Sequence, residues 1–113
     1  MVDDDEEVLD TIRDVLRVNG HEVVTASNYD SALALWSESA FDLVVVDYEL
    51  NDLTGVDLAE FVWSGSPGIP VLLMTGHTPE LLPMEDAIRQ RLRFIAKPFK
   101  VKEFRAAVAA ALG

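Results

Sequence analysis

Short apolar runs alternate along this chain with segments in which apolar residues recur every three or four positions. The runs cover residues 43–46, 71–74 and 94–96, and a shorter one, Met1-Val2, stands at the start. A continuous apolar run between polar residues is typical of a strand buried on both faces of a sheet, and the helical spacing is typical of the helices that cover it. The alternation therefore predicts βα units around a parallel sheet.

The helices are predicted between residues suited to their ends. Asp5 is a plausible N-cap for a first helix that ends at Asn19-Gly20, and Ser27 or Asn28 caps a second. A turn over residues 51–55 precedes a short helix over 56–63, and a last, alanine-rich helix has Val101, Phe104 and Val108 on its inner face. Residues 21–26 read as a strand. Pro79 and Pro83 predict a short or irregular helix, because proline suits only a first helical turn.

Five strands joined by right-handed crossovers favour a flavodoxin-like, doubly wound α/β fold. The expected order is 2-1-3-4-5, with helices on both faces and a single domain over residues 1–113. The first strand is central in that order, yet only Met1 and Val2 precede Asp3, so it is truncated relative to a typical strand. We expect lower stability than in an N-terminally extended form, which a comparison of melting temperatures would test.

Composition narrows the class of protein. Half of the 113 residues are hydrophobic, which disfavours disorder, and the absence of cysteine excludes disulfides and thiolate metal sites. Neither a membrane span nor a signal peptide is evident, so a soluble cytoplasmic domain is expected.

The net charge of −11 argues against direct nucleic-acid binding. Of the nine Lys and Arg residues, only Arg13 and Arg17 lie in the first half of the chain; the other seven lie between Arg89 and Arg105. This stretch could meet an acidic protein partner, although solvated helix-end charges explain it equally well.

Reactive side chains stand at four predicted strand ends. These are Asp3 with Asp4, then Asp47, Thr75 and Lys97. In the expected strand order these ends surround one crevice. Crowded carboxylates favour a divalent cation, and oxygen ligands suit Mg²⁺.

In such a crevice an aspartate can act as a nucleophile toward phosphorus, while Lys97 and the Thr75 hydroxyl could bind phosphoryl oxygens. Taken alone, each residue is better explained as a cap, a turn residue or part of a surface loop. Their order along the chain and their convergence on one crevice favour the joint site.

The whole chain resembles the response-regulator receiver domains of two-component signalling. The resemblance rests on the acidic opening VDDDE (2–6), on FDLVVVD (41–47), on Gly55, on IPVLLMTG (69–76) and on FIAKPF (94–99). It implies that Asp47 accepts the phosphoryl group and that Asp3, Asp4, Asp47 and the Glu49 carbonyl bind Mg²⁺. It also implies a cis Lys97–Pro98 peptide bond.

The same resemblance implies how the domain acts. A histidine kinase or a histidine phosphotransfer protein would supply the phosphoryl group, and the receiver would promote transfer to its own aspartate without being a conventional enzyme. Thr75 and Phe94 would form the switch. The signal would leave through the fourth helix, fifth strand and fifth helix, the region of the basic residues. Residues 93–99 look somewhat like the terminal receivers of hybrid histidine kinases.

Several positions depart from the common receiver pattern. Asn51 stands where proline is frequent and predicts a more mobile loop; Thr54 replaces a frequent acid, and residues 90–92 (QRL) replace a small Gly-Ala step. Glu49 and His77 each lie two residues beyond a site residue. We expect them to pair across the crevice and to tune the lifetime of the phosphoryl group, with two unpaired exposed side chains as an equal alternative.

Three other functions compete with a receiver. A phosphorylation-independent interaction module would keep the fold without the switch, and Mg²⁺-dependent phosphorylation separates the two. A phosphohydrolase of the haloacid-dehalogenase type is distantly suggested by Asp47 and Glu49, but Leu50-Asn51 does not continue that motif. A flavin carrier shares the fold class, but the acidic loop after Val2 would repel its phosphate.

Overall fold

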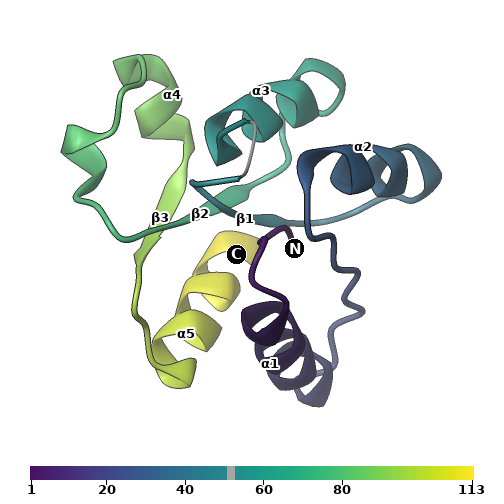
Figure 1. Cartoon of the computed structure of the whole chain (residues 1–113). Coiled ribbons are helices and arrows are strands. Elements are labelled where there is room, and N and C mark those ends of the chain that lie inside the picture. The colour runs from purple at the N-terminus through teal and green to yellow at the C-terminus, as the bar shows by residue number, and fades with distance from the viewer. Residues whose placement is uncertain (51–52) are drawn as a thin grey trace.

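A parallel sheet forms the centre of the molecule, with helices on both faces (Figure 1). The structure is a computed structural model that describes residues 1–50 and 53–113; the predictions for Asn51 fall outside them. Three strands lie in the order β1-β2-β3, namely β1 (Val44–Asp47), β2 (Val71–Thr75) and β3 (Arg93–Ala96). The helices are α1 (Glu6–Val18), α2 (Tyr29–Glu38), α3 (Gly55–Gly65), the 3₁₀ helix η1 (Pro79–Leu81), α4 (Asp86–Arg91) and α5 (Val101–Leu112).

The strand register brings the carboxyl ends of the strands to one edge of the sheet. Asp47 pairs with Met74, and Thr75 at the end of β2 pairs with Ala96 at the end of β3. Because all three strands are parallel, whatever follows each of them emerges at that edge. This is why residues distant in sequence can meet there.

The first two predicted strands are reduced to isolated bridges. Val2 bridges Ala26 on one side and Val46 on the other, both in parallel, which keeps the expected spatial order 2-1-3-4-5 and confirms the flavodoxin-like class. The strand predicted over residues 21–26 was wrong except at Ala26. Before Ala26, the Val24 carbonyl accepts a hydrogen bond from the Met1 amino group at 2.9 Å, but one such bond does not make a strand.

Local signals explain where the helices begin. The Asp5 carboxylate accepts hydrogen bonds from the backbone N–H groups of Glu7 and Val8, as predicted for an N-cap, and Asn28 caps α2. Thr54 and Asp57 form a reciprocal capping box at the start of α3, which begins at Gly55 rather than at residue 56. The segment containing Pro79 and Pro83 forms only η1 and the six-residue α4, as its prolines predicted.

Two apolar clusters fill the two sides of the sheet. Residues of α2 and α3 pack with Val44, Val46 and Leu73 on one side, and residues of α1 and α5 pack with Val45 and Leu72 on the other. This division is visible in Figure 1, where α2, α3 and α4 lie on one face of the sheet and α1 and α5 on the other. No helix within the described ranges is both long enough and apolar enough to span a bilayer.

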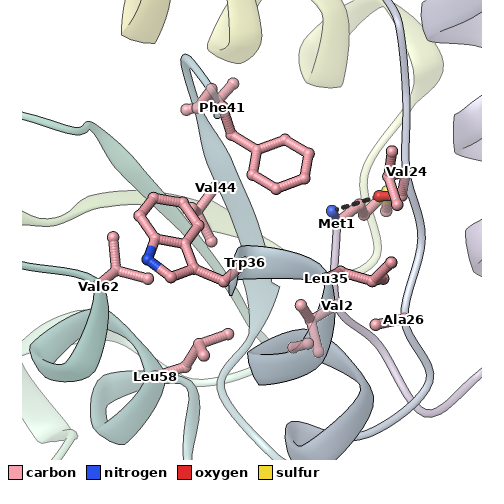
Figure 2. A pocket seen from close by; sticks show the side chains of 12 residues that line it. Met1, Val2, Val24, Ala26, Leu35, Trp36, Phe41, Val44, Leu58 and Val62 are labelled. Atoms are coloured by element: carbon pink, nitrogen blue, oxygen red, sulfur yellow. Dashed lines mark hydrogen bonds between the residues drawn. The ribbon is translucent and has the colours of Figure 1, made fainter. Parts of the chain in front are cut away.

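A small apolar cavity of about 40 Å³ lies between α2, α3 and the start of β1 (Figure 2). Trp36 and Phe41 stack at its wall with their ring centroids 5.8 Å apart, and Val44, Leu58 and Val62 line it as well. Val44 is the first residue of β1, whereas Asp47 is the last. The cavity therefore belongs to the core near the opposite end of the strand from the predicted site.

Candidate functional site

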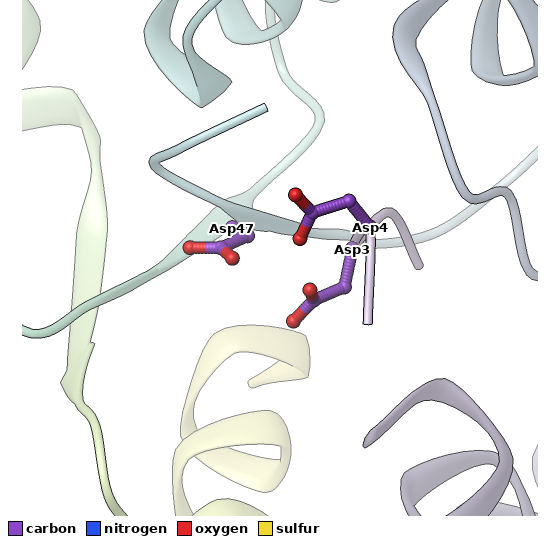
Figure 3. Close-up of side chains that lie close together, drawn as sticks. All are labelled: Asp3, Asp4 and Asp47. Atoms are coloured by element: carbon purple, nitrogen blue, oxygen red, sulfur yellow. The ribbon is translucent and has the colours of Figure 1, made fainter. Parts of the chain in front are cut away.

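Three carboxylates converge at the carboxyl edge of the sheet (Figure 3). Asp47 ends β1, and Asp3 and Asp4 follow the Val2 bridge that lies beside it. One oxygen from each carboxylate lies within 4.8 Å of the others. Asp3 is fully buried, Asp47 is 9% exposed and Asp4 is exposed. Such crowding of negative charge in a partly dry site needs a cation nearby.

Lys97 supplies positive charge to this cluster. Its Nζ donates to Asp3 Oδ2 and to Asp47 Oδ2, each at 2.9 Å. The remaining Asp3 oxygen accepts from the Asp5 N–H at 2.9 Å, and Asp47 Oδ1 accepts from the Glu49 N–H at 3.3 Å. The Lys97–Pro98 bond is cis, as expected from the resemblance. The backbone of Lys97 also donates to the Thr75 carbonyl at 2.8 Å, which joins β3 to the end of β2.

Burial and hydrogen bonding have opposite effects on the pKa of Asp47, and likewise on the pKa of Lys97. Burial raises the pKa of Asp47 and outweighs its hydrogen bond to Lys97, and the charge of Asp3 adds to the rise. For Lys97, burial lowers the pKa, but the hydrogen bonds that it donates to the Asp3 and Asp47 carboxylates, together with their negative charges, exceed that effect and leave its pKa above the ordinary value. The surroundings therefore favour the charged form of Lys97, whereas they disfavour the ionised form of Asp47.

Thr75 and Gly55 complete the frame around Asp47. Thr75 is 2% exposed, and its Oγ1 accepts from the His77 N–H at 3.0 Å. Gly55 donates its N–H to the Tyr48 carbonyl at 2.8 Å, and a Cβ at this position would lie 2.5 Å from the Asp47 carbonyl oxygen. Only glycine allows α3 to start this close to the end of β1.

A crevice of about 310 Å³ opens over Asp47, Thr75 and Lys97. Its mouth is crossed by a contact of 3.3 Å between His77 Nε2 and Glu49 Oε1, the two side chains expected to pair. Both are largely exposed. Tyr48 and Gly76 also line the crevice. Gly76 ends the motif over residues 69–76, whereas Tyr48 was not predicted as a site residue although it directly follows Asp47.

The predicted output face has fewer free bases than its sequence suggests. Arg89, Arg91 and Arg105 hydrogen-bond within the chain, to carbonyl oxygens, Asp86 and Asn19. Lys97 belongs to the site. Phe94 is half-buried in β3 and packs against the cluster on the α3 side of the sheet.

The donor set fits a hard divalent cation. The three carboxylates offer only oxygen atoms, and one of them is exposed, so retained water ligands would have room. Mg²⁺ prefers such ligands and keeps several waters. The fold and this site together define a doubly wound α/β domain with a carboxylate cluster able to hold a metal ion at the carboxyl edge of its sheet.

Comparison with known proteins gives the family. Residues 1–109 match the family model of the response regulator receiver domain, and the chain belongs to that family. Receiver domains of response regulators are phosphoacceptors of two-component signalling and generally bind Mg²⁺; they are not enzymes in the ordinary sense.

Individual relatives agree with this membership. Over 91% of the present chain, the sequence is 31% identical to the probable transcriptional regulatory protein TcrX of Mycobacterium tuberculosis. Over 99% of the present chain, it is 29% identical to the transcriptional regulatory protein KdpE of the same species. It spans 44% and 49% of these relatives. Among solved structures, the NtrX receiver domain of Brucella abortus (33% identity, TM-score 0.86, 98% of this chain and 94% of that one) and CheY4 of Vibrio cholerae (25%, 0.88, 97% and 93%) share the fold.

Proposed function

We propose that residues 1–113 form one receiver domain in which Asp47 takes a phosphoryl group from a phosphohistidine on a cytoplasmic histidine kinase or histidine phosphotransfer protein. The observation that carries this proposal is the ammonium of Lys97, held 2.9 Å from both Asp3 and Asp47 beside a third carboxylate. Sequence separations of 94 and 50 residues make this convergence a property of the fold rather than of a local turn.

Asp3, Asp4, Asp47 and the backbone carbonyl of Glu49 would hold Mg²⁺, which neutralises charge on the phosphoryl oxygens during transfer. An Asp47 oxygen forms the new O–P bond as the N–P bond of phosphohistidine breaks, and the imidazole nitrogen keeps the electron pair. Lys97 would exchange its bond to Asp47 for one to a phosphoryl oxygen. The Thr75 hydroxyl would turn from the His77 N–H to donate to another.

The direct test is labelling by acetyl phosphate, followed by intact mass. We expect one phosphoryl adduct on the wild type with Mg²⁺, and none with EDTA or in Asp47→Asn. Asp42→Asn, which removes an exposed acid just before the same strand, should label normally. Absence of the adduct from a folded wild type would favour the phosphorylation-independent module, and turnover of a chromogenic phosphate ester would favour the phosphohydrolase.

We further propose that the donor docks in a groove of about 590 Å³ beside the site. The groove runs between α1 and the segment after β3, is mainly apolar, and reaches Lys97 at one end. A bulky Thr11→Trp substitution on its α1 wall should slow transfer from a phosphorylated histidine phosphotransfer domain. Labelling by acetyl phosphate, which needs no docking surface, should be unchanged; equal slowing of both would contradict this assignment.

The Glu49–His77 contact supports a role for both side chains in the lifetime of the aspartyl phosphate. Closing the mouth of the crevice would restrict the approach of water to phosphorus. We expect His77→Ala to speed dephosphorylation several-fold, whereas His21→Ala, at the only other histidine, should not. An unchanged rate in His77→Ala would refute the role.

Signal output is proposed through α4, β3 and α5, with Thr75 and Phe94 as the switch. Within the described part of the chain, Arg93, Lys100 and Lys102 make no side-chain ion pair, so they are the bases left to meet an acidic partner protein. Charge reversal at Arg93 should weaken binding of the downstream partner without changing labelling by acetyl phosphate.

A further inference from the structure

The segment that follows β1 is paired with the segment that precedes α3. Glu49 and Thr54 lie opposite each other in an isolated antiparallel bridge. Two backbone hydrogen bonds of 3.2 and 2.8 Å flank this pair, one from the Leu50 N–H to the Leu53 carbonyl and one from the Gly55 N–H to the Tyr48 carbonyl. Because these bonds join the neighbours of the pair and not the pair itself, Glu49 and Thr54 form a non-hydrogen-bonded pair.

The type of bridge determines where the Glu49 carbonyl points. The two residues of a non-hydrogen-bonded pair turn their N–H and C=O groups away from each other, and in an extended residue both groups lie on the same side. On the outer side of Glu49, its N–H donates to Asp47 Oδ1 at 3.3 Å. The Glu49 carbonyl therefore faces the carboxylate cluster, as a ligand of Mg²⁺ at that cluster must.

Thr54 is held on its own outer side by the start of α3. Its N–H donates to Asp57 Oδ2 at 2.8 Å, and its Oγ1 accepts from the Asp57 N–H at 3.3 Å. The Thr54 hydroxyl also donates to Asp57 Oδ2 at 3.1 Å. Gly55 and Val56, the first residues of α3, are buried. Thr54 is therefore fastened to a helix end that is itself packed into the core.

We propose that the Thr54–Asp57 pair positions the Glu49 carbonyl for the divalent cation. The contacts run from the start of α3 through Thr54 and its bridge to Glu49. Neither Thr54 nor Asp57 belongs to the proposed donor set, so both are positioning residues. Mg²⁺ demands near-ideal octahedral geometry, and a displaced carbonyl ligand lowers its affinity. The metal step rests on the proposed function, whereas the path of contacts to Glu49 does not.

The first experiment measures Mg²⁺ binding by isothermal titration calorimetry, without phosphorylation. Thr54→Val keeps the shape and charge of the side chain but removes the oxygen that accepts from the Asp57 N–H, whereas Thr54→Ser keeps that oxygen. We expect the Kd for Mg²⁺ to rise roughly tenfold in Thr54→Val, the lower end of the loss seen when a partner of a metal ligand is removed, and to return to the wild-type value in Thr54→Ser. A wild-type Kd in Thr54→Val, or an equally weak Thr54→Ser, would overturn the proposal.

Two controls separate positioning from stability and from charge. Val62→Ala truncates a side chain of α3 that is 1% exposed, so it should lower stability in urea yet leave the Kd for Mg²⁺ unchanged. Asp57→Asn and Asp57→Ala remove the same charge, but only asparagine keeps an oxygen for the Thr54 N–H, so the alanine variant should bind Mg²⁺ more weakly. Equal weakening in Val62→Ala and Thr54→Val, or equal affinities in the two Asp57 variants, would reduce the pair to a helix cap.

The second experiment needs no metal and so separates failure of this proposal from failure of the proposed function. In EDTA, hydrogen exchange should rise several-fold at the Gly55 amide, which donates to the Tyr48 carbonyl, in Thr54→Val but not in Thr54→Ser. Unchanged exchange in Thr54→Val would overturn the positioning role even if wild type bound Mg²⁺ well. The expected exchange in a wild type that binds no Mg²⁺ would instead contradict the proposed metal site, and would leave the pair a purely structural role.

Discussion

Replacing Gly55 by alanine should destabilise this protein far more than a glycine-to-alanine change at the start of a helix ordinarily does. The added Cβ would lie 2.5 Å from the Asp47 carbonyl oxygen and 2.7 Å from Leu73 Cδ1. Neither neighbour can give way easily, because one is backbone at the end of β1 and the other belongs to a fully buried side chain. The start of α3 must move away from β1 instead.

The expected loss of folding stability in Gly55→Ala is the difference between two opposing effects. Overpacking of a well-packed core costs about 1–3 kcal/mol and occasionally more, and a backbone neighbour places this site at the upper end. The loss of backbone freedom in the unfolded chain returns about 0.4–1 kcal/mol. We expect a net loss of about 2 kcal/mol, which for a domain of this size lowers the melting temperature by roughly 8 °C.

Gly65 gives a matched control at the other end of the same helix. A Cβ there meets nothing within 4 Å, so Gly65→Ala should be neutral or more stable by about 0.5–1 kcal/mol. Urea unfolding followed by tryptophan fluorescence measures both variants. Equal free energies of unfolding for Gly55→Ala and Gly65→Ala would show that the close approach of α3 to β1 does not require glycine at position 55.

Three further outcomes follow from the charges of the site. In EDTA, Lys97→Met should lose about 2 kcal/mol of stability, because it leaves two buried carboxylates without their shared cation; Lys100→Met should lose almost nothing, and equal losses would contradict this view. Millimolar Mg²⁺ should raise the melting temperature of the wild type, and do so much less in Asp4→Asn, whose exposed side chain the fold does not need; an equal rise would exclude Asp4 as a ligand. Because burial raises the pKa of Asp47, the folded chain binds that proton more tightly than the unfolded chain does. In EDTA, wild type should therefore lose stability relative to Asp47→Asn as the pH rises from the ordinary value of 3.8 through the raised pKa, and a constant difference in urea unfolding would contradict this.

The sequence was enough to predict which residues meet at the site, because these residues lie at the ends of parallel strands. The apolar run before Asp47 predicts a buried strand, and parallel strands bring Thr75 and the residue after Ala96 to the same edge. No long-range information is needed beyond the strand order. The Thr54–Asp57 capping box could also have been read from its spacing, which would have placed the start of α3 correctly.

Other features depended on partners that the sequence does not reveal. Val23, Val24 and Thr25 have the β-branched side chains of a strand, yet a strand also needs a continuous ladder of backbone hydrogen bonds. Here the bridge forms at Ala26, and the segment before it gains one further bond, from the Met1 amino group to the Val24 carbonyl. The arginines of α4 bind mainly backbone carbonyls. Every residue has a carbonyl, so composition gives no sign that these bases are used inside the fold instead of on a docking surface.

The charge of the site is compatible with the proposed role of Asp47 as a nucleophile that is largely buried. Three carboxylates and one ammonium leave two negative charges, the amount that one divalent cation neutralises. Asp3 keeps the same two partners whatever happens at Asp47, because its oxygens are bound by the Asp5 N–H and by Lys97. In the proposed transfer, Lys97 would release Asp47 and bind a phosphoryl oxygen while its hydrogen bond to Asp3 keeps it in position. The fully buried Asp3 therefore holds Lys97 beside Asp47, and the raised pKa of Asp47 results chiefly from its burial, with the negative charge of Asp3 adding to it.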